Sequence, residues 1–138
     1  MKKTFVIILL VLMICAALVS CGLVKSPDKY ELGDKDSVSS ITKVVGERTV
    51  KTTRTSSQYV KYVYKNIADT VADVEKYAAY LVNNEGFTAS KKYKNIDPAG
   101  EIKFTKTSES DSAYLIVVTV TYTESEYTVE AERQNKVL

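Results

Sequence analysis

Several segments of this 138-residue chain alternate apolar and polar side chains with a period of two. In "YVKYVYK" (59–65), Val60, Tyr62 and Tyr64 fall on one face of an extended chain, and the intervening residues fall on the other. Tyr and Val are strong strand formers, so the spacing predicts a strand here. A fold built on such segments is centred on a β-sheet.

The same pattern predicts further strands on both sides of this one. "RTVKTTRT" precedes it and is joined to it by a turn near residues 55–58. The later strand candidates are "FTASKKYK", "EIKFTKT" with Ile102 and Phe104 on one face, "AYLIVVTVTY", and "EYTVEAER" with Tyr127, Val129 and Ala131 inward. "AYLIVVTVTY" is so apolar that it predicts a central strand with both faces covered or partly covered.

One segment has helical periodicity instead. Thr70 is a candidate N-cap, Gly86 suits a C-terminal cap, and one apolar stripe lies between them, formed by Val71, Val74, Ala78, Leu81 and Val82. The spacing predicts a helix over about 70–84, and residues 38–45 also allow a short helix. The expected fold class is α+β: an antiparallel sheet of about five or six strands, in the chain order β-β-α-β-β-β-β, with the helix packed on one face.

The N-terminus has the layout of a secretory signal. Lys2 and Lys3 are followed by the apolar run 5–19 and then by the small Ser20. The run has fifteen residues, fewer than the roughly 20 of a membrane-spanning helix. An ordinary cleavage site is the alternative, but Leu18 and Val19 do not provide the small residues that such a site prefers.

"LVSC", residues 18–21, resembles the lipobox of bacterial lipoproteins: a branched apolar residue, a tolerant position, a small residue and a cysteine. The resemblance implies cleavage between Ser20 and Cys21 and a diacylglyceryl group on the Cys21 thiol. It also implies export and anchoring of the chain to the outer face of the cell membrane. The residue after the lipidated cysteine is Gly22 and not Asp. In this it resembles the lipoproteins that are not held at the inner membrane, which implies the outer membrane in a two-membrane host.

Cleavage there defines three regions. Residues 1–20 are a signal peptide that is removed. Residues 21–40 are rich in Ser, Asp, Lys and Gly, which predicts a flexible tether with an end-to-end distance of about 25 Å. Residues 41–138 form a single α+β domain.

Composition limits the chemistry of this domain. The chain has no histidine, and its second cysteine, Cys15, lies within the signal, so we expect no catalytic residue, no metal site and no cofactor. Ser40 and Lys43 match an S-x-x-K motif, and Asp34 and Asp36 resemble the start of a calcium loop, but the remaining elements of both motifs are missing. Without Lys2 and Lys3, 17 basic residues balance 17 acidic ones, so we expect no nucleic-acid partner.

Tyrosine is abundant, with ten residues. Tyr62, Tyr64, Tyr77 and Tyr80 are the candidates for a ligand surface, because tyrosines in a groove stack on sugars or hold peptides. The alternative is that these tyrosines occupy half-buried core positions of the sheet and helix.

Three functional hypotheses remain. The first is a lipid-anchored, extracytoplasmic, non-enzymatic binding or interaction domain, held at the membrane through Cys21, with a membrane or cell-envelope protein as its expected partner. The second is a small-ligand or glycan-binding accessory module of a transporter or cell-wall enzyme. The third, a carboxylate-based hydrolase, requires a pair of acidic residues facing each other across a cleft, and the sequence pairs none. The sequence predicts no oligomeric state.

Overall fold

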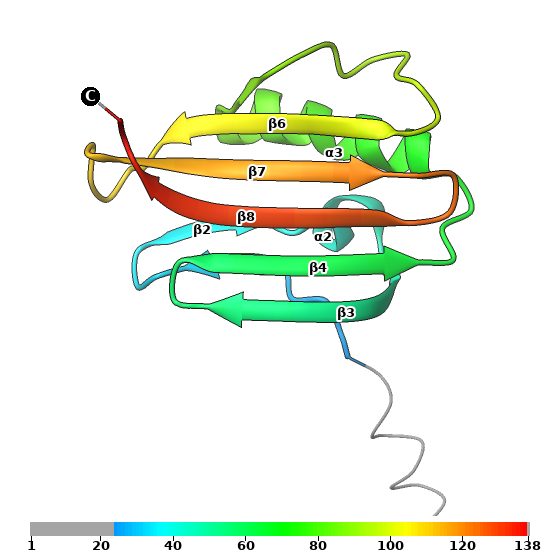
Figure 1. Cartoon of the computed structure of the whole chain (residues 1–138), viewed down its shortest axis with the longest axis horizontal. Helices are drawn as coiled ribbons and strands as arrows, with labels where there is room; N and C mark the ends of the chain where they lie inside the picture. The colour runs from blue at the N-terminus through cyan, green and yellow to red at the C-terminus, as the bar shows by residue number, and fades with distance from the viewer. Residues whose placement is uncertain (1–23, 138) are drawn as a thin grey trace, which may run out of the picture.

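The main element of the fold is a six-stranded antiparallel sheet (Figure 1). The structure is a computed structural model that describes residues 24–137. The strands are β3 (Thr49–Ser56), β4 (Tyr59–Lys65), β5 (Thr88–Ala89), β6 (Gly100–Thr107), β7 (Tyr114–Tyr122) and β8 (Tyr127–Asn135). Their spatial order is β3-β4-β8-β7-β6-β5. With the helix between β4 and β5, this confirms the predicted α+β class and the order β-β-α-β-β-β-β.

The predicted helix is α3, Thr70–Glu85. Its N-cap is Asp69 rather than Thr70: the Asp69 side chain accepts a hydrogen bond of 2.9 Å from the Ala72 N–H. Its C-cap is Gly86, whose φ of 76° lies in the left-handed region that glycine adopts without strain. The helix lies on one face of the sheet, as expected.

Asp69→Ala is expected to lower the free energy of unfolding by about 1 kcal/mol, because the substitution leaves the first N–H groups of α3 without their acceptor. Urea unfolding followed by circular dichroism measures the change. Asp69→Asn retains a side-chain oxygen at the cap and should cost a few tenths of that amount. Equal losses for the two variants would contradict a capping role.

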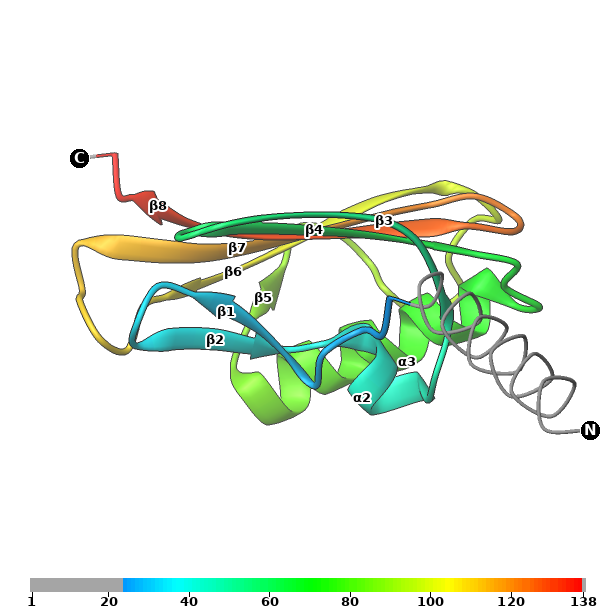
Figure 2. The same ribbon diagram turned by 90° about the horizontal axis from the view of Figure 1, so that it is seen from below.

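The second layer contains more than the helix (Figure 2). A hairpin of β1 (Lys29–Leu32) and β2 (Asp36–Ser39) and a short helix α2 (Ile41–Val45) lie beside α3 on the same face of the sheet. Residues 21–40 were expected to form a flexible tether, and this is wrong for the described residues 24–40. Tyr30 and Leu32 have exposed fractions of 1% and 0%, so the hairpin is part of the core.

The core lies between these two layers. The residues predicted to share one face of a strand, and on the last strand to face inward, are all buried: Val60, Tyr62, Tyr64, Ile102, Phe104, Tyr127, Val129 and Ala131. β7 lies within the sheet between β8 and β6. Its Ile116, Val118 and Val120 are buried in the core, while Leu115 and Val117 on the other face are partly or largely covered by neighbouring side chains.

β5 is shorter than the strand expected from "FTASKKYK". Only Thr88 and Ala89 pair with β6, and the chain then turns toward α3. The Ile96 N–H donates to the Glu75 carboxylate on α3 (3.1 Å), and the Tyr93 and Ile96 side chains pack against the core. These contacts outweigh the strand propensity of the segment, so β5 ends early.

The N-terminal predictions lie outside the described residues. These are the signal peptide 1–20, the lipobox at residues 18–21, the cleavage site at Ser20 and lipidation at Cys21. Within residues 24–137, neither helix is long and apolar enough to span a membrane.

Candidate functional site

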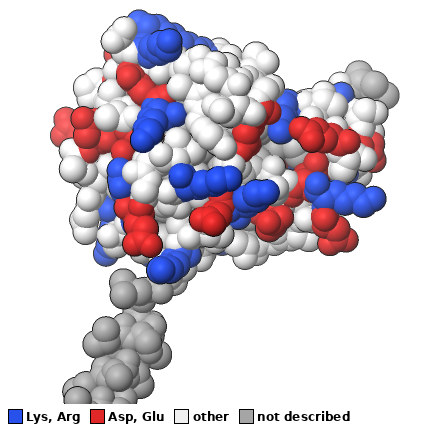
Figure 3. All heavy atoms as spheres, turned by 180° about the vertical axis from the view of Figure 1, so that it is seen from behind, with Lys and Arg blue, Asp and Glu red and all other residues white. Residues whose placement is uncertain are grey.

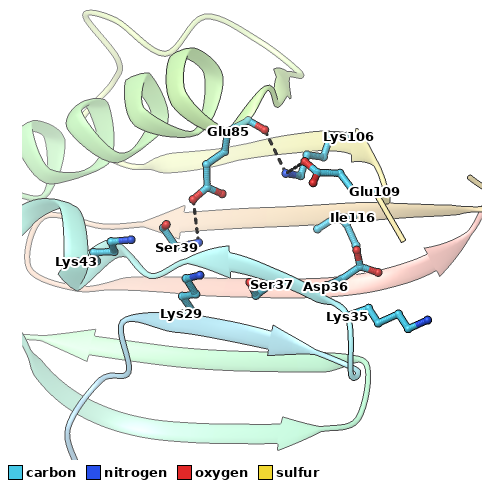
Figure 4. Close-up of a pocket in the computed structure, with 10 residues that line it drawn as sticks. All are labelled: Lys29, Lys35, Asp36, Ser37, Ser39, Lys43, Glu85, Lys106, Glu109 and Ile116. Carbon is cyan, nitrogen blue, oxygen red and sulfur yellow. Dashed lines mark hydrogen bonds and ion pairs between the residues drawn. The ribbon is translucent and has the colours of Figure 1, made fainter. Parts of the chain in front are cut away.

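A polar crevice of about 240 Å³ opens between β2, the end of α3 and the β6–β7 turn (Figure 4). Its lining residues are Lys29, Lys35, Asp36, Ser37, Ser39, Lys43, Glu85, Lys106, Glu109 and Ile116. The hairpin and α2 supply one wall, whereas the last residue of α3 and the end of β6 supply the other. The crevice exists because β2 pairs with β1 along one edge only, so that its other edge faces α3 across a gap.

The hairpin register determines which backbone groups face the crevice. Lys29 pairs with Ser39 and Tyr30 pairs with Val38. Ser39 N–H donates to Glu85 Oε1 (3.1 Å), so it points away from β1. Successive N–H groups of a strand point to opposite edges, so residues two apart point to the same edge. The Ser37 N–H therefore points away from β1, like that of Ser39. Among the described residues, no acceptor bonds to the Ser37 N–H.

Asp36 forms a buried polar cluster at the inner end of the crevice. Its carboxylate accepts hydrogen bonds from the hydroxyls of Ser108 (2.8 Å) and Ser110 (2.8 Å). Arg133 Nε lies 2.9 Å from Asp36 Oδ2, but its N–H is not directed at that oxygen, so the contact is an ion pair rather than a hydrogen bond. The Arg133 guanidinium also stacks on the Tyr114 ring, 3.7 Å from its centroid.

The charges around the crevice are unevenly compensated. Asp36 pairs with Arg133, and Glu109 pairs with Lys106 (3.6 Å). Lys29, Lys35 and Lys43 are exposed, and none of them forms an ion pair with another described residue. Figure 4 shows Lys29 and Lys43 extending toward Ser39 from β1 and α2. The rim of the crevice is therefore cationic, although acidic and basic side chains are interspersed over the wider face seen in Figure 3.

The four tyrosines proposed as a ligand surface lie elsewhere. Tyr64 and Tyr77 are 0% exposed and Tyr62 is 9% exposed, so these three belong to the core; Tyr80 is half-buried on α3. Only Tyr62 and Tyr64 stack on each other, with ring centroids 6.1 Å apart. The ligand surface is wrong for Tyr62, Tyr64 and Tyr77, and the alternative of core packing holds for them, because β4 and α3 direct these three side chains into the space between the two layers.

The buried tyrosines bind the hairpin to the sheet and to α3 through their hydroxyls. The Tyr64 hydroxyl is hydrogen bonded to Tyr30 (2.8 Å) and to Ser26 (2.7 Å), and Tyr77 donates to the Ser39 carbonyl (2.8 Å). Burial raises the pKa of Tyr30 and of Tyr77 well above the usual value for tyrosine. These phenols therefore stay protonated and act as structural hydrogen-bonding groups.

A second, partly buried ion pair joins the residue before β3 to α3. Arg48 donates to both carboxylate oxygens of Asp73, at 2.7 and 2.8 Å, and Tyr127 donates to the same carboxylate (3.0 Å). Burial, followed by the charge of Asp73, raises the pKa of Tyr127. The carboxylate accepts three hydrogen bonds and pairs with a guanidinium, so this cluster connects the two layers through a hydrogen-bonded ion pair.

The two rejected motifs have structural roles. Ser40 is the N-cap of α2 and accepts a hydrogen bond from the Lys43 N–H (3.2 Å), so the S-x-x-K match reflects helix capping. Asp34 lies in the exposed hairpin turn, and Asp36 points into the cluster with Arg133. Within residues 24–137, no three His, Cys, Asp or Glu side chains are grouped to hold a metal ion.

Comparisons with known proteins do not assign this site. No protein-family model, no curated protein and no solved structure matches the chain. The sequence interpretation missed the crevice residues Lys29, Ser37 and Glu85. The signal that predicts β1 and β2 is the alternation of Tyr30, Leu32, Asp36 and Val38 around a Gly33 turn, and the average polarity of the segment masks it.

Proposed function

We propose that the chain is a lipid-anchored, extracytoplasmic protein with a small, non-enzymatic binding domain. The observation that carries the proposal is the "LVSC" motif at residues 18–21, which directly follows a basic start and a short apolar run. A diacylglyceryl group supplies two acyl chains, and two chains hold a protein stably at a membrane, whereas a single chain does not.

The first residues that the structure describes support a position close to the lipid. Ser26 is hydrogen bonded to the buried Tyr64 hydroxyl (2.7 Å) and accepts a hydrogen bond from the Thr42 hydroxyl (2.8 Å). Five residue steps separate Cys21 from Ser26, a reach of about 17 Å for a fully extended chain. A lipid on Cys21 would therefore hold this domain against the membrane surface, without the long tether expected from the composition of residues 21–40.

Cys21→Ser is expected to abolish incorporation of labelled palmitate and to leave an unprocessed precursor, because serine lacks the thiol that receives the lipid. Metabolic labelling in a bacterial host, followed by electrophoresis and membrane fractionation, measures both effects. Cys15→Ser is the matched control, since it removes the other thiol of the chain within the apolar run and should leave labelling intact. Unchanged labelling of the Cys21→Ser chain would overturn the proposal.

The crevice supports binding rather than catalysis. Its most buried carboxylate, Asp36, is paired with Arg133 and two serine hydroxyls, so it is not poised to accept a proton from a substrate. A glycan platform of tyrosines has no support, because the tyrosines concerned are in the core or isolated. The second hypothesis was a module that binds a small ligand or a glycan. Of these two, the geometry favours a small ligand bound in the crevice.

A further inference from the structure

The free edge of β2 already binds one carboxylate. Glu85 Oε1 accepts the Ser39 N–H at 3.1 Å, in the manner of an anion docked on a strand edge. Two residues along the same edge, the Ser37 N–H points into the same crevice, and among the described residues it has no acceptor. Ser37 itself lines the crevice, and its hydroxyl is a second donor on the same residue. On this edge, therefore, Ser37 offers donors without an acceptor next to the Ser39 N–H, which already has one.

The charges at the rim favour an anion at this position. Four lysines and three carboxylates line the crevice. Asp36 is neutralised by Arg133, which lies behind the crevice wall, and Glu109 is paired with Lys106. The third carboxylate, Glu85, accepts the Ser39 N–H and forms no ion pair. Lys29, Lys35 and Lys43 also form none among residues 24–137, and Figure 4 shows Lys29 and Lys43 extending toward Ser39, so the unpaired charge of the lining is positive overall. An ammonium group paired with an incoming carboxylate forms a charge-assisted hydrogen bond, which is stronger than a neutral one.

The size of the crevice limits the ligand. Its 240 Å³ corresponds to the volume of about eight water molecules. This volume accommodates an acylated amino acid or a dipeptide.

We propose that this crevice binds the carboxylate of a small compound of amino-acid or dipeptide size. The carboxylate would accept hydrogen bonds from the Ser37 N–H and hydroxyl and would pair with Lys29 and Lys43. The inference rests on the proposed binding role of the domain and names the ligand class. It does not depend on lipidation of Cys21.

The test is a titration of the full chain, purified in a non-ionic detergent, with N-acetylalanine. Amide chemical shifts in ¹H–¹⁵N spectra report binding. We expect saturable shifts at Ser37 and its neighbours. N-acetylalanine amide has nearly the same shape but no charge, and it should produce no saturable shift. Equal responses to the acid and the amide would overturn the proposal.

Charge variants separate this site from general attraction of anions. The double substitution Lys29→Gln and Lys43→Gln should weaken binding about tenfold, since it removes two charged partners of the carboxylate. The control, Lys91→Gln with Lys92→Gln, removes the same charge from an exposed loop outside the crevice and should leave the affinity unchanged. The same loss of affinity in both double variants would overturn the proposal.

Ser37→Pro removes the N–H at a position where proline is tolerated, because this N–H faces the free edge of its strand. We expect saturable binding to disappear while the remaining amide spectrum keeps the pattern of the folded chain. Ser37→Ala keeps the N–H and should retain weaker binding. Full affinity in a folded Ser37→Pro chain would exclude the backbone contact and overturn the proposal. Palmitate labelling plays no part in these measurements, so a failure here is distinct from a failure of the lipid anchor.

Discussion

Asp36→Ala is expected to lower the free energy of unfolding by about 3 kcal/mol, the order of loss found when one partner of a buried ion pair is removed. The Asp36 side chain is 6% exposed, and Arg133 beside it is 16% exposed. Removing the carboxylate leaves the Arg133 guanidinium without its counter-charge and leaves the Ser108 and Ser110 hydroxyls without their acceptor. The cluster connects the hairpin to β8 and to the β6–β7 turn, so the loss weakens the attachment of the hairpin. Chemical denaturation of purified protein measures the change.

The matched control is Asp34→Ala in the exposed turn of the same hairpin. This substitution also removes one carboxylate and should change the free energy of unfolding by less than about 0.5 kcal/mol. Combining Asp36→Ala with Arg133→Met should recover part of the loss, because the uncompensated charge is then gone. If Asp36→Ala and Asp34→Ala had the same small effect, the cluster would contribute nothing to stability.

The same cluster makes stability depend on pH. Burial opposes ionisation of Asp36, but hydrogen bonds from Ser110 and Ser108 and the charge of Arg133 outweigh it and lower the pKa of Asp36 below its usual 3.8. The unfolded chain therefore binds this proton more readily than the folded one, so the contribution of Asp36 is complete above the unfolded pKa and is lost as the pH falls through the folded value. Denaturation midpoints measured below pH 4 should fall more steeply for the natural chain than for Asp36→Ala.

Local patterns were sufficient to predict the sheet and its helix. The period of two in β4 and β8 and the capped apolar stripe of α3 each extend over many residues, and each agrees with its burial in the fold. The order of the strands in space was not predictable in this way. β4 pairs with β8, more than sixty residues later in the chain, because α3 crosses the inner face of the sheet and returns the chain at the opposite edge. Side-chain alternation describes a strand's faces and does not identify its neighbours.

The hairpin was missed because composition and pattern disagree within it. Ser, Asp, Lys and Gly dominate residues 24–40, yet the few large apolar residues there, Tyr30, Leu32 and Val38, all fall on one face of the two strands. The crevice was missed for the same reason, since it is formed by a free strand edge that requires the hairpin to exist. The polarity of the segment reflects its outer face and its edge, where Lys29 and Ser37 lie.

Leu32→Ala provides the sharpest test of whether the hairpin belongs to the folded domain. Leu32 is the last residue of β1, and its side chain is 0% exposed within the hydrophobic core. Truncating a fully buried leucine removes its transfer free energy and leaves a cavity, so we expect the free energy of unfolding to fall by about 2–5 kcal/mol. A flexible tether would predict no change, because a solvated side chain contributes equally to the folded and unfolded states.

The control for Leu32→Ala is Glu31→Ala, one residue away on the exposed face of the same strand. It should change the free energy of unfolding by less than about 0.5 kcal/mol.

Hydrogen exchange gives an independent measure. In the natural chain the Tyr30 and Leu32 amides, which bond across to β2, should exchange far more slowly than those of an unstructured segment. In the Leu32→Ala chain the same amides should lose protection before those of β7 and β8, because the hairpin contacts the sheet through side chains, whereas β7 and β8 are joined by a full hydrogen-bonded ladder. If Leu32→Ala and Glu31→Ala were equally stable and these amides were unprotected in both, residues 24–40 would be a flexible tether. The crevice, which depends on the hairpin, would then not form.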